Sequence, residues 1–362
     1  MSTAIVFEGT YLSPESALGT LPGSPVYYGL ESLTTNLVPN TPVNDVESQG
    51  TILPVGVTSE KEMTDIDFSG DLAFNDLIYI LSNCLCLADV AQDAAHATVF
   101  YWTFKPKAKN ADTFQTYGAI QGQDAGASSA PGVHFSSLDF EFSEKKAGVS
   151  GKGFGQVYNH AATEPADPVI VPLIPITPAN MDVFVASTYA GIAAGQISDC
   201  EGAKLSFPDR KTPIKTRDSR KPSYSSIVQK RIVPTAQIVV DKNTSSAGYL
   251  TSLRAKTTNF CRIQYLGPQI GSTGVTYGVD FDYAFKFKKM SPSGQNDQFV
   301  STFDMGLTLD NTAFDGAWCA ITITTDMSPT VAGINTLLGA LGAGTVPTVA
   351  NAAAAEAAGD LG

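Results

Sequence analysis

The sequence has few of the residues that usually build catalytic or metal sites. It contains five cysteines and three histidines, and charged residues make up only 16% of the chain. The cysteines are odd in number and scattered, so a disulfide framework is not expected. Cys84 and Cys86 lack the two-residue gap of a zinc or redox motif. We expect all five to be reduced, mostly buried, small hydrophobic residues.

The histidines and glycines do not form a recognisable site either. His96, His134 and His160 occur in unrelated contexts, without metal spacing or a base–nucleophile pair, and we expect them on the surface or in turns. The alternating glycines of residues 151–155, GKGFG, lack the Walker spacing of a phosphate loop, and in a strand they indicate close packing of another backbone. The sequence therefore predicts no catalytic residue, no metal, no cofactor and no enzyme.

Long apolar runs are also missing. Nothing approaches the roughly 18 consecutive apolar residues of a membrane-spanning helix. The amino terminus, MSTAIVFEGT, has neither a basic region nor an apolar stretch of signal-peptide length, so we expect a cytoplasmic protein without membrane contact. The net charge of −12 and the pI near 4.7 argue against tight coating of nucleic acid, because phosphate binding needs clustered cations.

The clearest pattern that is present lies at residues 279–288, VDFDYAFKFK. A period of two predicts a strand with one face in a core and the other in water. The residues predicted to face the core are Phe281, Tyr283, Phe285 and Phe287, and those on the other face include Asp280, Asp282, Lys286 and Lys288.

Residues 138–142, LDFEF, repeat this pattern earlier in the chain. Leu138, Phe140 and Phe142 share one parity, whereas Asp139 and Glu141 share the other. The neighbouring segments also recur in the same order: strand, short helix, strand, loop, alternating strand, turn, strand. Two copies of one unusual strand, in two similar surroundings, predict two copies of one domain.

The predicted organisation has five parts, and the fold class is mainly β. Prolines and glycines in the first sixty residues favour an extended arm that lies on its own domain or on a neighbouring copy, and five prolines near the middle favour a stiff connector. Lys105–Gly132 is expected to be a long polar loop, and residues 73–82 a short amphipathic helix. The parts are an N-terminal arm (1–60), a first domain (61–160), the connector (161–180), a second domain (181–326) and an Ala/Gly-rich tail (327–362).

One segment has an unusual charge. From Lys204 to Arg231 cations far outnumber acids, whereas the rest of the chain is acidic. Three interpretations remain open: a nucleic-acid site, for which interleaved aromatic residues are scarce; a solvated loop; and a contact with an acidic surface of another copy. The residues assigned to an inter-subunit or inter-ring contact are Arg210, Lys211, Lys215, Arg217, Arg220 and Lys221.

With these features the chain resembles the tail tube proteins of long-tailed, siphovirus-like bacteriophages. The resemblance covers about residues 60–326 and is carried by the order of IDFSGDLAFNDLIYILS, SSLDFEFSEK, GVSGKGFG, PANMDVFVAS, YGVDFDYAFKFKK and WCAITITTD. It rests on pattern and order rather than on a catalytic signature.

The resemblance implies a structural virion protein. In this family β-sheets of several subunits close into one barrel, rings stack into a tube, and variants with a duplicated tube domain form trimeric rings that imitate hexamers. It implies self-assembly as trimers or hexamers, other tail proteins at the tube ends, assembly in the host cytoplasm, and passage of double-stranded DNA without specific binding. Asp139, Glu141, Asp280, Asp282, Lys286 and Lys288 would then face a negatively charged lumen, where carboxylates repel phosphate.

Two other classes of function remain open at this point. A β-sandwich adhesin or carbohydrate-binding module would need an exposed aromatic platform, whereas the alternating aromatic residues here share a face with the predicted core. A capsid or decoration protein is closer in class, and the sequence does not separate it from a tube protein.

Overall fold

The computed structural model describes residues 8–46, 56–123, 126–241, 244–295 and 298–334. The chain is mainly β, as predicted, with three α-helices among the described residues. The predicted tail beyond Ile334 lies outside the described residues. Two 3-10 turns, Pro178–Asn180 and Ile192–Ala194, interrupt the strands.

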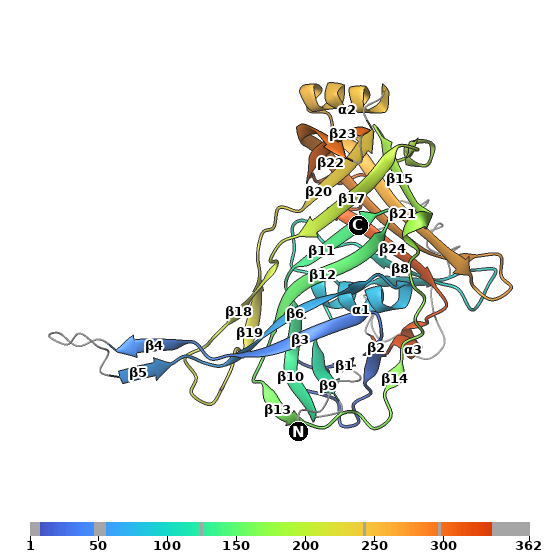
Figure 1. The fold of residues 1–362 in the computed structure, drawn as a ribbon. Coiled ribbons are helices and arrows are strands. Elements are labelled where there is room, and N and C mark those ends of the chain that lie inside the picture. Colours follow the sequence, from blue (N-terminus) through green and yellow to red (C-terminus); the bar gives the residue numbers. More distant parts are fainter. Residues whose placement is uncertain (1–7, 47–55, 124–125, 242–243, 296–297, 335–362) are drawn as a thin grey trace.

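The largest feature is a sheet of eight antiparallel strands that crosses the whole molecule (Figure 1). In sheet order the strands are β3 (Leu33–Asn40), β6 (Met63–Asp71), β12 (Lys146–Gly155), β11 (Leu138–Ser143), β17 (Cys200–Phe207), β20 (Thr235–Asp241), β23 (Gln298–Leu307) and β22 (Thr276–Gln295). The first four come from the N-terminal half of the chain and the last four from the C-terminal half.

The two halves of this sheet have the same connectivity. In the first half β6 leads into helix α1 (Phe74–Cys84), and the later hairpin β11–β12 returns so that its second strand pairs with β6. In the second half β20 leads into helix α2 (Thr244–Ala255), and the hairpin β22–β23 returns to β20 in the same way. The strand, helix and hairpin of the order expected from the sequence are therefore present in both halves. The strand that follows each helix is placed differently, because residues 259–269 pair with β22 whereas, within the described chain, residues 100–104 do not pair with β11.

The long strand β22 belongs to two layers. Its second part pairs with β23, whereas its first part is flanked by β21 (Asn259–Gln269) and β24 (Cys319–Thr325). Beyond these lie β15 (Met181–Ala186) and β16 (Gln196–Ile197) on one side, and β8 (Phe100–Phe104) and β7 (Asp89–Gln92) on the other. The two alternating strands meet across the core, since the Phe281 ring centroid lies 5.0 Å from that of Phe140 and 5.3 Å from that of Phe142.

A smaller sheet covers the first half. Its order is β14 (Val169–Ile170), β2 (Tyr28–Leu30), β1 (Glu8–Pro14), β9 (Tyr117–Gln123), β10 (Gly126–Phe135) and β13 (Asn159–Ala162). The polar loop predicted at Lys105–Gly132 is therefore wrong in part, because its Gly/Ala/Ser-rich end forms the β9–β10 hairpin. The first segment of the chain lies on its own domain through β1, β2 and β3.

Helix α1 lies inside the molecule rather than on its surface. All eleven of its residues are buried, so the helix was predicted correctly but its amphipathic character was not. Most of its polar residues have partners from distant segments: Asn83 Nδ2 donates to the carbonyl oxygens of Gln115 (2.8 Å) and Val133 (2.9 Å). Buried polar groups without such partners would each cost about 1–3 kcal/mol.

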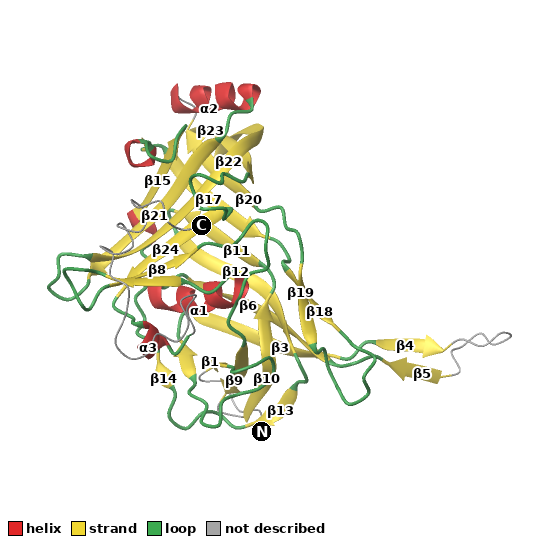
Figure 2. Cartoon of the chain, turned by 180° about the vertical axis from the view of Figure 1, so that it is seen from behind, coloured by secondary structure: helices red, strands yellow, loops and turns green. Residues whose placement is uncertain are grey.

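Two hairpins lie along one side of the molecule (Figure 2). β4 (Val43–Val46) and β5 (Gly56–Ser59) form one that projects outward, and β18 (Lys211–Ile214) and β19 (Ser226–Gln229) form the other. The described chain ends after a short helix, α3 (Pro329–Ala332).

The glycines of β12 allow another backbone to approach closely. A Cβ atom at Gly151 would lie 2.3 Å from the carbonyl oxygen of Ser137, and one at Gly153 would lie 2.5 Å from that of His134. Both distances are shorter than van der Waals contact, which confirms the packing interpretation of the GKGFG segment.

Candidate functional site

The core side of both alternating strands is confirmed. The seven predicted side chains are all at least 96% buried: Leu138, Phe140, Phe142, Phe281, Tyr283, Phe285 and Phe287. Complete burial of a side chain of this size stabilises a fold by about 1.5–3 kcal/mol. These residues therefore fix which face of the eight-stranded sheet is turned outward.

The outward face forms one continuous polar surface, which we call the polar sheet face. Asp139, Glu141, Lys286 and Lys288 are all exposed on it. Residue pairing can be followed from strand to strand across the sheet, with register shifts at residues 200–202 of β17 and 287–289 of β22. One line of outward residues consists of Thr34, Ser69, Ser150, Asp139, Ser206, Thr235, Gly306 and Lys286. Four residues predicted to face a lumen thus lie on a single surface shared by both halves of the chain.

Acidic and basic side chains alternate on the polar sheet face. Lys204 Nζ lies 3.0 Å from Glu141 Oε1, and Lys146 Nζ lies 4.0 Å from Glu141 Oε2. Lys204, and to a lesser degree Lys146, hold the pKa of Glu141 below its usual value. Because these lysines are interspersed among the carboxylates, the expectation of a predominantly negative face is not met on this part of the sheet.

The placement of Asp282 in water is wrong. Asp282 is 96% buried, and its carboxylate accepts hydrogen bonds from Arg262 Nε (2.7 Å) and from the Tyr189 hydroxyl (2.8 Å). Asp280 is partly buried beside it and accepts from Gln264 Nε2 at 2.7 Å. Burial raises the pKa of Asp280, while Gln264 and then Arg262 oppose this rise.

The cause is a cover over the first part of β22. A second, smaller hydrophobic cluster lies on the outward side of β21, β22 and β24, and it comprises Ile192, Phe260, Ala284, Phe314, Ala317 and Ala320. Tyr189 contacts Phe314, with ring centroids 5.0 Å apart. Loops from two distant parts of the chain thus exclude water from a strand face that the sequence pattern assigns to solvent.

Two cations of the basic segment are also misassigned. Arg210 and Lys211 are at least 95% buried and lie at the C-terminal end of α1. Arg210 donates to the Leu85 carbonyl oxygen and to Asp112 Oδ2, and Lys211 Nζ donates to the Asn83 carbonyl oxygen. The last carbonyl groups of a helix attract cations, so these two side chains cap α1 instead of reaching another subunit.

Burial has a large effect on the acid–base properties of this cap. Desolvation lowers the pKa of Lys211 to about 7, and Arg210 adds to the lowering. Lys211 Nζ also lies 3.9 Å from the centroid of the Phe114 ring. No local sequence pattern indicates this cluster, because the carbonyl groups and Asp112 belong to other segments.

The other four cations assigned to an inter-subunit contact lie around the tip of the β18–β19 hairpin. Lys215 Nζ is 3.2 Å from Glu60 Oε2, and Arg220 forms a hydrogen-bonded ion pair with Asp218, with Nε 2.9 Å from Oδ1. Arg217 and Lys221 are exposed. Their assignment to a contact with another subunit stays a prediction.

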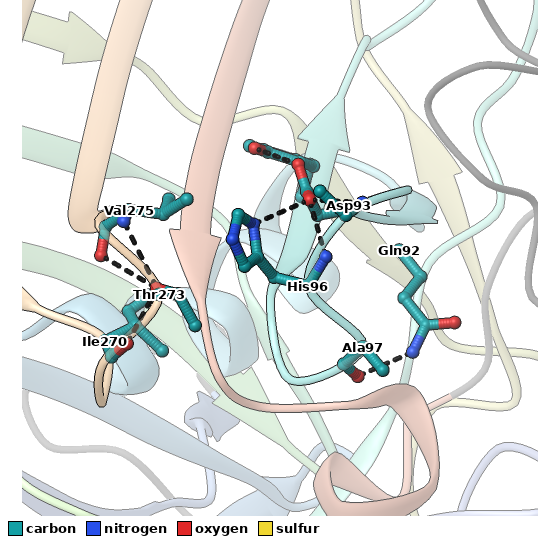
Figure 3. A network of polar contacts seen from close by, with 9 residues as sticks. Gln92, Asp93, His96, Ala97, Ile270, Thr273 and Val275 are labelled. Atoms are coloured by element: carbon teal, nitrogen blue, oxygen red, sulfur yellow. Dashed lines mark hydrogen bonds and ion pairs between the residues drawn. The ribbon is translucent and has the colours of Figure 1, made fainter.

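The histidines do not come together. His134 is buried between the rings of Phe114 and Phe154, and burial lowers its pKa to about 2, so it is neutral and not a surface residue. His96 lies on a loop with its Nδ1 3.0 Å from Asp93 Oδ1, as Figure 3 shows. Within the described part of the chain, no group of three or more His, Cys, Asp or Glu residues is arranged to hold a metal ion.

Comparisons with known protein families and with curated proteins found no match to this chain. In the residues that the structure describes, no helix has the length and apolar character needed to cross a membrane.

Proposed function

We propose that this protein is a structural subunit that assembles into rings, and that the rings stack as the tail tube of a long-tailed bacteriophage. The observation that carries the proposal is the eight-stranded sheet, which has an aromatic core beneath it and the continuous polar sheet face above it. The repeated four-strand order supports a duplicated tube domain, so that three chains would supply six similar units.

The two ends of the sheet support closure between subunits. Among the described residues β3 pairs only with β6, and β22 beyond Phe285 pairs only with β23, so each presents one open edge. On the β3 edge the Leu37 N–H donates to Gln121 Oε1 (3.0 Å), a contact that a neighbouring strand would replace. Unpaired edges invite pairing with another chain, and closure of a ring removes them.

The strand count fits this closure. Because the sheet has an even number of antiparallel strands, β22 of one copy and β3 of the next run in opposite directions and can pair. Three chains of eight strands each would form a barrel of 24 strands, and barrels of 16 to 18 strands already leave an aqueous channel. A homotrimeric ring is therefore the assembly we propose.

The polar sheet face would line that channel. Carboxylates repel phosphate, and their alternation with lysines leaves no cluster of cations that would hold DNA tightly. Double-stranded DNA would thus pass during ejection without specific binding. In this assembly the protein acts as a conduit and not as an enzyme, and Arg217, Lys221 and their neighbours contact an adjacent ring.

Electron microscopy of the purified protein, combined with light scattering to count chains, tests the proposal. We expect hollow rings or rods with three chains per ring. Closed shells would favour a capsid or decoration protein instead. A protein that stays monomeric at all concentrations and salt conditions would contradict the proposal.

A further inference from the structure

The two open edges of the eight-stranded sheet carry opposite charges. Next to the β3 edge, β6 exposes Asp65 and Asp67, and neither β3 nor β6 contains a lysine or arginine. The β22 edge exposes Lys286, Lys288 and Lys289, and residues 285–295 contain no acid. The neighbouring strand β23 has one partly buried acid, Asp304, which lies opposite Lys289 and accepts a hydrogen bond from Gln237 Nε2. Between these edges the charges alternate, so the asymmetry is confined to the two ends of the sheet.

One aspartate is already oriented toward its edge. Asn40 Nδ2, on β3, donates to Asp65 Oδ2 at 2.6 Å, which holds the carboxylate against the edge strand. Asp65 is exposed and has no cation within ion-pair distance in the single chain as described. It therefore offers a negative group to a strand added beside β3.

The internal junction between the two halves gives a template for the register of that added strand. The junction pairs β11 with β17, and in the repeat these strands correspond to β22 and β3. Asp71 and Asp241 each lie three residues before the first residue of the following helix, which aligns the two halves.

From this alignment the pairings can be followed across the sheet. Ser69 on β6 corresponds to Val239 on β20. Their pairing partners therefore correspond as well, which are Thr34 on β3 and Gly202 on β17. Four residues further along the same two strands, Val38 corresponds to Ser206. On the side of the hairpins, Ser150 pairs with Ser69 and Thr302 pairs with Val239, so Ser150 corresponds to Thr302. Asp139 pairs with Ser150 and Ser291 pairs with Thr302, so Asp139 corresponds to Ser291. Since Asp139 pairs with Ser206 inside the chain, Ser291 of one copy is expected opposite Val38 of the next.

We propose that the seam between copies of this chain has Ser291 opposite Val38 and Lys289 opposite Asn40, so that Lys289 and Lys288 meet Asp65 of the next copy. This inference rests on the proposed ring and names the residues that select its register. Attraction of opposite charges across the seam favours the correct edge-to-edge contact, and like charges would oppose a β22–β22 or β3–β3 contact.

Charge reversal tests the seam. In the double variant Lys288→Glu/Lys289→Glu, the concentration for half-maximal ring formation should rise about tenfold or more at low salt. The reason is that the two introduced glutamates would face Asp65 of the next copy, and like charges repel. Adding Asp65→Lys to the same chain restores opposite charges and should restore assembly. The matched control Lys107→Glu/Lys109→Glu changes two exposed lysines outside the sheet and should leave assembly unchanged.

Cysteine cross-linking tests the register. Ser291→Cys combined with Val38→Cys should give disulfide-linked chains up to a covalent trimer on mild oxidation, since directly opposed residues lie within disulfide reach. Ser291→Cys with Asn36→Cys, shifted by two residues on the same face, should link poorly. Circular dichroism and thermal unfolding check that each variant is folded.

The outcomes separate the seam from the proposed function. If the wild-type chain forms rings but the charge reversal has no effect, or the shifted cysteine pair links as well as the aligned pair, this seam is wrong and the tube proposal stands. If the wild-type chain forms no rings, the tube proposal fails and the seam fails with it.

Discussion

The two halves of the chain share a strand order but treat their helices in opposite ways. In the first half α1 is buried on every side, beneath the smaller sheet and against the strands of the core. In the second half α2 lies at the end of the β22–β23 hairpin, where Tyr249 and Leu253 pack on the core and most other described residues face water (Figure 1).

This difference shows what the repeated topology does and does not determine. The eight-stranded sheet needs only that each half supplies four strands in the same order, and both halves do so. The packing of the helix depends instead on what else the chain adds, and the first half adds the strands β1, β2, β9 and β10. We therefore expect the first half to carry most of the stability of the chain outside the shared sheet.

The largest predicted effect compares the two helices directly. Leu77→Ala in α1 removes a side chain with no exposure and should lower the free energy of unfolding by about 2–5 kcal/mol, because the buried site cannot collapse fully. Leu253→Ala in α2 should cost less than about 1.5 kcal/mol, because this side chain is only partly buried. Urea-induced unfolding followed by circular dichroism measures both, and equal losses would contradict the difference between the halves.

The comparison of the two halves also shows which structural features can be predicted from the sequence alone. Alternation identified the core side of β11 and β22, because period two is a local property of a strand. It could not place Asp282, since the cover over β22 comes from residues near Tyr189 and Phe314, which are distant in sequence. The helical spacing of α1 can be recognised in its sequence, but its complete burial cannot, because the covering strands come from other segments.

Polar side chains are the residues that a local pattern places least well. An amphipathic α1 would have its polar residues in water, yet most of them bond to Ser32, Thr325 and other groups brought in by the fold. Arg210, expected in a contact with another subunit, completes the C-terminal end of α1 instead. Each of these assignments depends on a partner from another segment, which no local pattern reveals.

A second prediction compares two acids that alternate with core residues, one on each of the two alternating strands. Asp282→Asn on β22 should cost about 3 kcal/mol, because Arg262 loses its buried anionic partner. The loss should lie at the low end of the usual range, since Arg262 Nη1 remains 3.9 Å from Asp280. Asp139→Asn on β11 is exposed and should change the free energy of unfolding by no more than about 0.5 kcal/mol. Similar losses from both variants, measured by thermal unfolding, would show that the cover over β22 is not formed.

The third prediction concerns Asp76, the third residue of α1, whose counterpart in α2 is Ser246. Burial raises the pKa of Asp76 to about 6, although its Oδ2 accepts hydrogen bonds from the Ser32 N–H and hydroxyl. The folded state therefore holds this proton more tightly than the unfolded state does, and stability from this group falls as the pH rises from about 4 to about 6.

Asp76→Asn removes that dependence without a large change in shape. Relative to the wild type, the variant should gain up to about 3 kcal/mol between pH 4 and pH 7.5, the equivalent of a shift of about two pKa units. The absolute gain at pH 7.5 should be smaller, because Asp76 Oδ1 has no hydrogen-bond partner among the described residues and an amide there would lack one too. Ser246→Ala has no titrating group and should change stability equally at both pH values. Parallel pH profiles for the wild type and Asp76→Asn would show that the carboxylate is not buried as described, and would weaken the distinction between the enclosed helix α1 and the exposed helix α2.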